Sequence, residues 1–215
     1  MKYHSDIKQN SEEWDEIRLG RITASKAADL LMDDKCAGYI KMINKIAEER
    51  FTGESCESDK FTGNWATERG HTFEPVARRD YEMKSFDDVD LVGFVSVGSW
   101  LGCSPDGLID KSKAIQIKCP IFSTQNKYLG LVRKHKLLSD NEIIKKLDGT
   151  YYKQMQFELF ICKDRIENIF YSYHPKLHRI QLKMVRDIKM QSEIRYNVRK
   201  AIKQINQLIK GYKGV

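Results

Sequence analysis

Two short segments constrain this chain more than any other part of its sequence: Ser104–Gly107, with the sequence Ser-Pro-Asp-Gly, and Ile115–Lys118, with the sequence Ile-Gln-Ile-Lys. Side chains alternate between the two faces of a β-strand, so the second segment is typical of a strand whose isoleucines pack into a core. Gln116 and Lys118 then lie together on the opposite face. The pattern predicts a sheet with one polar face that is free for chemistry.

Asp106 precedes this predicted strand. A carboxylate and a lysine beside a third oxygen-bearing side chain can bind Mg²⁺ or Mn²⁺ and place a water against a phosphodiester. That is the layout of the PD-(D/E)xK nuclease site, in which Lys118 would orient the water and neutralise charge on the phosphate. The pattern has an acid where this chain has Gln116. Taken singly, the Pro-Asp-Gly run is typical of a turn and the lysine of an edge charge, but together they favour a nuclease.

A second acid is available upstream of the predicted sheet. A metal-dependent nuclease needs two or more carboxylates that converge on the cation, and Glu74 is the best-placed candidate. The segment Trp65–Met83 is predicted to be helical, with a kink at Pro75. Glu74 by itself would be interpreted as a solvated helix acid, and beside Asp106 it becomes a candidate metal ligand.

The segment Arg18–Ser25 contains a candidate site for a terminal phosphate. Ser25 is predicted in the first turn of a helix over Thr23–Leu31, where free backbone N–H groups favour an anion. Arg18 can add a bidentate guanidinium group. The alternative interpretation is a capped helix with a surface arginine.

Two glutamines lie on an amphipathic helix predicted over Tyr151–Ile161. Gln154 and Gln156 are two residues apart, and residues at that spacing do not share one face of a helix. At most one of them is therefore expected to contact the site.

The overall pattern predicts an α/β protein with a central mixed β-sheet flanked by helices. A chain of 215 residues can bury one full core, so residues 1–215 are expected to form a single domain. Ser11 is expected to cap a short first helix. Strands are predicted over Leu91–Val97, Leu101–Ile109, Ala114–Cys119, Ile166–Tyr173 and Ile180–Val185, one or two helices over Ser123–Leu147, a basic helix over Lys189–Lys210, and a loop over Thr52–Asn64.

The chain carries a formal net charge of +7, and its basic residues are spread along the whole sequence. This distribution suits a polyanionic partner such as nucleic acid, although a solvated basic surface has the same composition. No segment approaches the run of about 18 apolar residues that a membrane span needs. We therefore expect a cytoplasmic protein with no membrane partner. The five cysteines form no CxxC pair and are expected to be reduced thiols.

Several motifs, in one consistent order, resemble the lambda exonuclease or YqaJ-type viral recombinase nucleases of phages. The resemblance runs through Trp14–Ser25, Gly70–Arg78, Gly102–Leu108, Ile115–Pro120 and Tyr151–Phe157. It implies a restriction-endonuclease-like core and a nuclease that degrades one strand of linear double-stranded DNA from its 5′ end, leaving a 3′ overhang. It also implies a ring-shaped homotrimer that works with a single-strand annealing protein.

The same resemblance implies roles for the residues of the predicted polar face. Asp106, the residue at position 116 and the backbone carbonyl of Ile117 would ligate Mg²⁺. Glu74 would help to bind a second metal ion or its waters. Lys118 would position the nucleophile.

Three further residues acquire roles from the resemblance. Gln154 would lie beside the scissile phosphodiester, and Arg18 and Ser25 would receive the 5′-phosphate. The family has glutamate at position 116, whereas Gln116 keeps a carbonyl oxygen but brings no negative charge, so weaker cation binding is expected.

The departure at position 116 leaves two explanations open: a tolerated natural variant or a disabled enzyme. It also leaves two alternative functions. One is a non-cleaving DNA-end-binding protein of nuclease descent. The other is a site-specific endonuclease, because the same type of site serves such enzymes.

Overall fold

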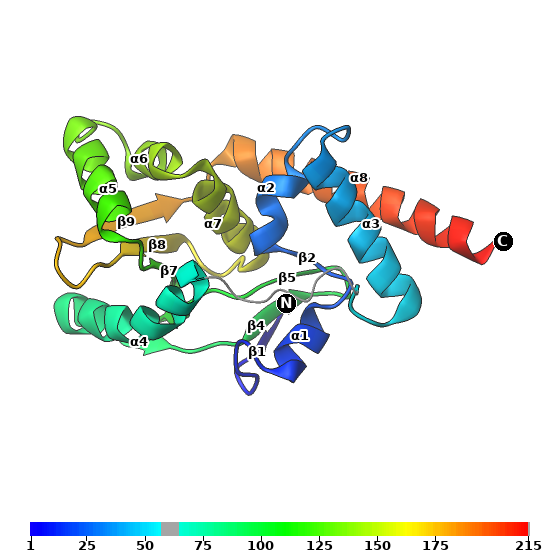
Figure 1. Cartoon of the computed structure of the whole chain (residues 1–215), viewed down its shortest axis with the longest axis horizontal. Helices are drawn as coiled ribbons and strands as arrows, with labels where there is room; N and C mark the ends of the chain where they lie inside the picture. Colours follow the sequence, from blue (N-terminus) through cyan, green and yellow to red (C-terminus); the bar gives the residue numbers. More distant parts are fainter. Residues whose placement is uncertain (57–64, 215) are drawn as a thin grey trace.

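The computed structural model describes residues 1–56 and 65–214, and it contains two mixed β-sheets with helices packed around them (Figure 1). The smaller sheet has the order β1-β4-β5-β2 and the larger has the order β3-β6-β7-β8-β9. The predicted α/β class is confirmed, but the single central sheet of the prediction is divided in two. The strands are β1 Lys2–His4, β2 Ile22–Thr23, β3 Val89–Asp90, β4 Phe94–Val97, β5 Leu101–Cys103, β6 Gly107–Ile109, β7 Lys113–Lys118, β8 Glu167–Ser172 and β9 Ile180–Val185.

The helices follow the sequence pattern closely. Ser11 caps α1 as expected, because its side chain accepts a hydrogen bond from the Trp14 N–H. The helix predicted from Thr23 instead begins as β2, which pairs in parallel with β5, and then continues as a 3₁₀ turn over Ala24–Lys26. The helices are α1 Glu12–Arg18, α2 Ala27–Leu30, α3 Ala37–Thr52, α4 Trp65–Ser85, α5 Phe122–Lys134, α6 Asp140–Leu147, α7 Gly149–Ile161 and α8 Ile188–Lys213.

The prediction of one continuous strand over Leu101–Ile109 is wrong, because the chain forms two separate strands, β5 and β6. The segment between these strands positions the site. β5 ends in the smaller sheet and β6 begins in the larger one, so the Ser-Pro-Asp-Gly run carries the chain between sheets. Pro105 has no N–H to donate to a strand ladder. A Cβ on Gly107 would lie 2.2 Å from the Val89 side chain, which explains the glycine where β6 pairs with β3.

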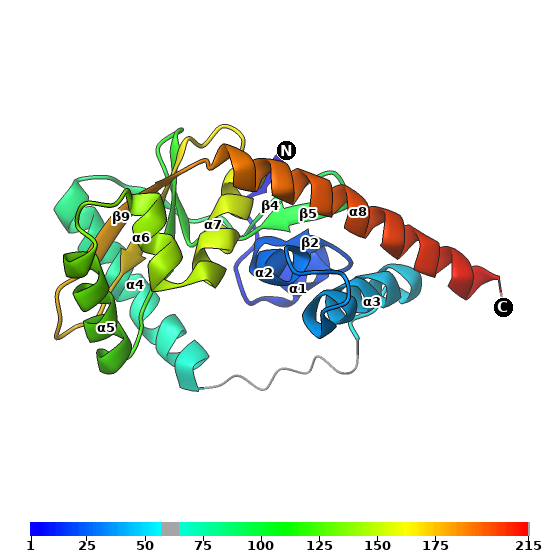
Figure 2. The ribbon, with the colours of Figure 1, turned by 90° about the horizontal axis from the view of Figure 1, so that it is seen from above.

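Helix α7 packs against both sheets (Figures 1 and 2). It contacts β4 and β5 of the smaller sheet, β8 and β9 of the larger sheet, and helices α2, α6 and α8. The helix predicted over Tyr151–Ile161 is present, but it is not amphipathic, because neighbours surround α7 and bury most of its second half. Even its polar residues Gln156 and Glu158 are almost fully buried.

Helix α4 packs on β7 and continues through Pro75. It ends at Ser85, slightly beyond the predicted end at Met83. The loop predicted over Thr52–Asn64 begins where α3 ends, and its residues 57–64 lie outside the described residues. Helix α8 packs along α3 on the other side of the molecule. In the described part of the chain, no helix combines the length and the apolar character that crossing a membrane would require.

Candidate active site

The polar face predicted on β7 is present, and the strand register explains its contacts. Gly107 of β6 pairs with Ile115, so β6 begins too late to pair with the last residues of β7. The Ile117 N–H donates instead to Oδ2 of Asp106 at 2.6 Å. Gln116 donates its side-chain nitrogen to the same carboxylate oxygen. The structure thus brings the predicted residues Asp106, Gln116 and Ile117 into direct contact.

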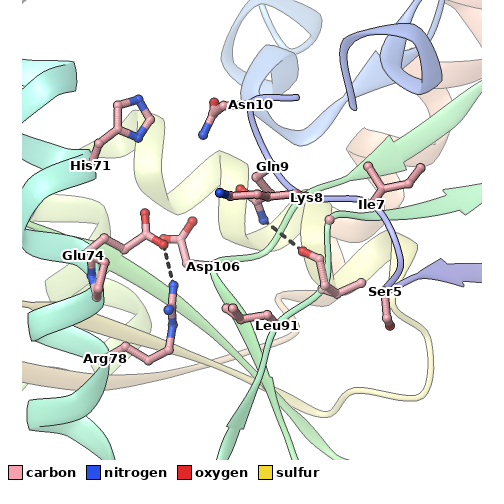
Figure 3. Close-up of a pocket in the computed structure, with 13 residues that line it drawn as sticks. Ser5, Ile7, Lys8, Gln9, Asn10, His71, Glu74, Arg78, Leu91 and Asp106 are labelled. Carbon is pink, nitrogen blue, oxygen red and sulfur yellow. Dashed lines mark hydrogen bonds and ion pairs between the residues drawn. The ribbon is translucent and has the colours of Figure 1, made fainter. Parts of the chain in front are cut away.

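A cavity of about 310 Å³ opens beside Asp106 (Figure 3). Glu74 on α4 points toward Asp106 from the facing wall. Arg78, one helical turn later, holds the Glu74 carboxylate with an Nη2–Oε1 distance of 2.6 Å. The N-terminal segment forms another wall, where Gln9 donates to the backbone carbonyl of Pro105 at 2.9 Å. The two acids predicted as metal ligands therefore share one cavity.

Lys118 lies at the end of β7, and its Nζ is 4.8 Å from the centre of the Tyr151 ring. An aromatic face attracts the positive charge of an ammonium group. That charge acts on Asp106. Burial is the largest influence on this carboxyl and raises its pKa to about 6, the Lys118 charge opposes the shift, and the Glu74 charge adds to it. Asp106 is therefore mostly ionised at neutral pH and can ligate a cation.

Gln116 connects Asp106 to a buried polar network. Gln154 on α7 donates its Nε2 to Oε1 of Gln116 at 2.9 Å and to Oε1 of Glu158 at 3.0 Å. Asn168 on β8 donates to the other oxygen of Glu158 at 2.7 Å. The network therefore runs without interruption from the cavity to a carboxylate in the core.

The two glutamines of α7 separate as predicted. Gln154 contacts the site, whereas Gln156 is buried and donates to the backbone carbonyl of Val185 at 2.8 Å. Gln156 also accepts a hydrogen bond from the backbone N–H of Asp187, at the start of α8. Its role is to hold α7 against the β9–α8 connection.

The oxygen atoms around the cavity fit a hard divalent cation. Asp106 and Glu74 supply carboxylates, and the Ile117 carbonyl points to the same side of β7 as its N–H. Gln116 differs, because its amide nitrogen faces Asp106. Within residues 1–56 and 65–214, no three His, Cys, Asp or Glu side chains group together as a metal site. Gln116 therefore becomes an additional oxygen ligand only when its amide turns over.

Arg18 and Ser25 also lie together, with Nη2 of Arg18 3.5 Å from the Ser25 hydroxyl. The guanidinium stacks on the Trp14 ring at 3.6 Å. The indole N–H of Trp14 in turn donates to the hydroxyl of Ser104 at 2.9 Å. One tryptophan thus links the predicted phosphate site to the Ser104–Gly107 segment that contains Asp106.

The sequence interpretation missed the roles of four residues around these sites. Arg78 follows Glu74 by four positions, a spacing that pairs opposite charges on a helix, so the sequence contained a signal for this contact. Trp14 is the first residue of the Trp14–Ser25 motif, but the sequence did not indicate its contacts with Arg18 and Ser104. Gln9 and Glu158 had no local signal, because their partners lie far away in the sequence or depend on how α7 packs.

The family model of the YqaJ-like viral recombinase domain matches residues 13–164, well over half of the chain. The protein belongs to the YqaJ-like viral recombinase family. All the predicted site residues fall within the match, as does Glu158, whereas Gln9 precedes it. No curated protein matches the chain at a significant level.

Solved structures agree with membership of this nuclease family. An alkaline exonuclease from Laribacter hongkongensis, LHK-Exo, has a TM-score of 0.76 and 28% identity over 94% of this chain and 96% of its own. The same values hold for its complex with dAMP. A phage-related exonuclease from Haemophilus somnus 129PT shares the fold, with a TM-score of 0.65 and 14% identity over 89% of this chain and 96% of its own. The YqaJ-like protein thus has the PD-(D/E)xK fold.

Proposed function

We propose that this protein is a Mg²⁺- or Mn²⁺-dependent exonuclease that degrades the 5′-ended strand of linear double-stranded DNA and leaves a 3′ single-stranded overhang. One observation supports this function above the others. Glu74 and Asp106 face one another across a cavity in a member of a nuclease family, and Lys118 acts electrostatically on Asp106. These are the residue types that metal-dependent phosphodiester hydrolysis requires.

In the proposed reaction, each residue acts through the group that it presents to the cavity. Asp106, Glu74 and the Ile117 carbonyl hold the cation, which when bound polarises the phosphodiester and makes a water more acidic. Lys118 keeps a positive charge close to Asp106 and stabilises the negative charge that builds up on the phosphate. Gln154 anchors Gln116 from the side of α7.

The 5′ polarity is supported by the contact between Arg18 and Ser25. The guanidinium and the hydroxyl lie 3.5 Å apart, at a separation that allows both to bind one phosphate group. Stacking on Trp14 holds Arg18 in place before a ligand binds. We assign the 5′-phosphate of the degraded strand to this pair.

Partners follow from the same proposal. The basic net charge suits double-stranded DNA ends, and the overhang would be taken up by a single-strand annealing protein. A homotrimer that encircles the DNA would keep the enzyme on its substrate. We place this activity in the cytoplasm, without a membrane partner. The complex of the relative LHK-Exo with dAMP supports nucleotide release from such a site.

A non-cleaving DNA-end-binding protein is the second candidate function. The observation in its favour is the hydrogen bond from the Gln116 amide nitrogen to Asp106, because an N–H group in this position occupies the carboxylate without offering a ligand to a cation. In this alternative, Arg18 and Ser25 still bind ends, and no strand is degraded.

End-labelled, 5′-phosphorylated linear duplex DNA distinguishes these functions when the parent protein and Gln116→Glu are incubated with it side by side in Mg²⁺. Loss of the 5′-ended strand with both proteins supports the enzyme as proposed. Degradation by Gln116→Glu alone identifies the parent as a disabled nuclease that binds ends. No degradation by either protein contradicts the exonuclease.

Two further substrates test the finer claims. A 5′-hydroxyl duplex should be degraded about tenfold more slowly than the phosphorylated one, because the Arg18–Ser25 site would be empty. Supercoiled plasmid should remain closed, since an exonuclease needs an end. Nicking of the plasmid would instead identify a site-specific endonuclease.

A further inference from the structure

Glu158 is a buried carboxylate that the proposed reaction does not use. It lies near the end of α7 and is 1% exposed. Both of its oxygens accept hydrogen bonds, one from Gln154 at 3.0 Å and the other from Asn168 at 2.7 Å. A carboxyl group with N–H donors at both oxygens is arranged for its ionised form. Glu158 therefore acts as the acceptor at the buried end of the network.

This acceptor sets the direction of the hydrogen bonds that lead to the cavity. Gln154 uses its nitrogen for both Glu158 and the carbonyl oxygen of Gln116. With its oxygen engaged, Gln116 presents its nitrogen to Asp106. The orientation of the Gln116 amide beside the cavity is therefore determined by Glu158 in the core, through two successive hydrogen bonds.

A proton on Glu158 reverses this direction. The new O–H needs an acceptor, and a turned Gln154 amide supplies one, because its oxygen has two lone pairs and can accept from both Glu158 and Gln116. Gln116 then donates its N–H toward Gln154 and points its own oxygen toward Asp106. A cation bound between these oxygens would favour this arrangement, whereas an empty site favours the original one.

The Asn168 amide turns less readily than the Gln154 amide when Glu158 is protonated. It is fully buried, and its side-chain oxygen is among the buried atoms of the described residues that lack a hydrogen-bond partner. Turning this amide would put an N–H₂ group at the unpartnered position and leave a buried donor unsatisfied. Gln154 is only half-buried, so its amide turns at lower free-energy cost.

We infer that Glu158 is a positioning residue for the cation site, which through Gln154 sets whether Gln116 presents nitrogen or oxygen beside Asp106. Cation binding is thereby coupled to the uptake of one proton by Glu158, with no other bond made or broken. This inference rests on the cation site of the proposed function.

The surroundings of Glu158 place this proton in an accessible pH range. Burial is the main cause that raises its pKa to about 8, and the nearby charge of Asp106 adds to the shift. Hydrogen bonds from Asn168 and Gln154 and the charge of Lys118 oppose it. Cys103 on β5 is a further titratable neighbour, and its own pKa is raised by burial and, in part, by Glu158. The sulfur of Cys162 lies 3.7 Å from that of Cys103.

Calorimetric titration with Mg²⁺ at pH 8.5, in two buffers of different ionisation enthalpy, tests the coupling. The parent protein should take up between half and one proton per cation. Glu158→Gln should take up none and bind Mg²⁺ about tenfold more tightly, since its amide donates to Gln154 permanently and one hydrogen-bond reversal is no longer required. Equal affinity and equal proton exchange in the two proteins would overturn the inference.

Matched variants separate this role from a structural one. In the Gln116→Glu background, Glu158→Gln should change Mg²⁺ affinity by less than about twofold, because a carboxylate offers oxygen in either orientation. Gln154→Met interrupts the network at a half-buried position, away from the core, and should also abolish proton uptake. Absence of Mg²⁺ binding in every protein would overturn the proposed cation site as well, whereas binding without an effect at Glu158 overturns this inference alone.

Discussion

The two sides of Gln116 differ in how they accommodate a carboxylate. On the cavity side, Asp106 lies near the positive charge of Lys118, and its pKa rises only to about 6. On the core side, Glu158 accepts hydrogen bonds from the amides of Gln154 and Asn168, and its pKa rises to about 8. Burial is the main cause that raises both values. The Lys118 charge is the strongest opposing influence at Asp106, whereas at Glu158 the negative charge of Asp106 adds to the shift and Lys118 acts only weakly.

This comparison indicates that the cavity side and the core side of Gln116 have different functions. The cavity side keeps Asp106 mostly ionised at neutral pH beside the cavity, as a cation ligand must be. The core side holds an acid that can exist in either protonation state near neutral pH and communicates with the cavity through two amides. Each of the following predictions tests one side of this division.

The largest effect is expected from Asp106→Asn, which removes a charge on the cavity side and keeps the shape. We expect a loss of roughly 10³-fold in the single-turnover rate of linear DNA degradation, in whichever of the parent and Gln116→Glu proteins is active. Asp110→Asn is the matched control, because Asp110 is exposed and asparagine tolerates its positive φ of 47°. Retention of activity within tenfold by Asp106→Asn would contradict the proposed ligand.

A smaller effect is expected from Lys118→Met, which removes the positive charge that acts on both sides. The pKa of Asp106 and that of Glu158 should both rise, and DNA degradation at neutral pH should slow by roughly 10²-fold. The rate measured as a function of pH checks this, since its acidic limb should move upward. Lys113→Met on the same strand, where the lysine pairs with Asp87, should leave the profile in place.

The last effect concerns stability instead of rate and is expected from Glu158→Gln on the core side. The pKa of Glu158 is higher in the folded chain than its ordinary value of 4.5, so the folded state binds the proton more tightly. Its stabilising contribution is present below about pH 4.5 and is lost as the pH rises to about 8. The variant should therefore gain on the order of 5 kcal/mol over the parent at pH 9 and little at pH 4.5.

Denaturant unfolding of the two proteins at both pH values measures this difference. The exposed Glu193→Gln is the control for a general effect of charge, and it should change stability equally at both values. A stability difference between parent and Glu158→Gln that does not grow with pH would show that folding does not raise the pKa of Glu158.

The site was more predictable than the architecture around it. Alternation along Ile115–Lys118 correctly placed Gln116 and Lys118 on one face, and the spacing of Gln154 and Gln156 correctly limited the contact to one glutamine. The division into two sheets was not predicted, because Leu101–Ile109 has the composition of one strand and its break depends on pairing with distant segments. The burial of α7 was missed for the same reason.

The sequence alone determined which side chains share a face, because strand and helix periods fix the direction of each side chain relative to its neighbours. It also determined the chemical types available for binding a cation and a phosphate. Only the tertiary structure decided that Gln116 presents its amide nitrogen to Asp106 and that the pKa of Glu158 is raised well above its ordinary value. Both depend on desolvation and on partners brought together when α7 packs between the two sheets, and neither is encoded in any local pattern.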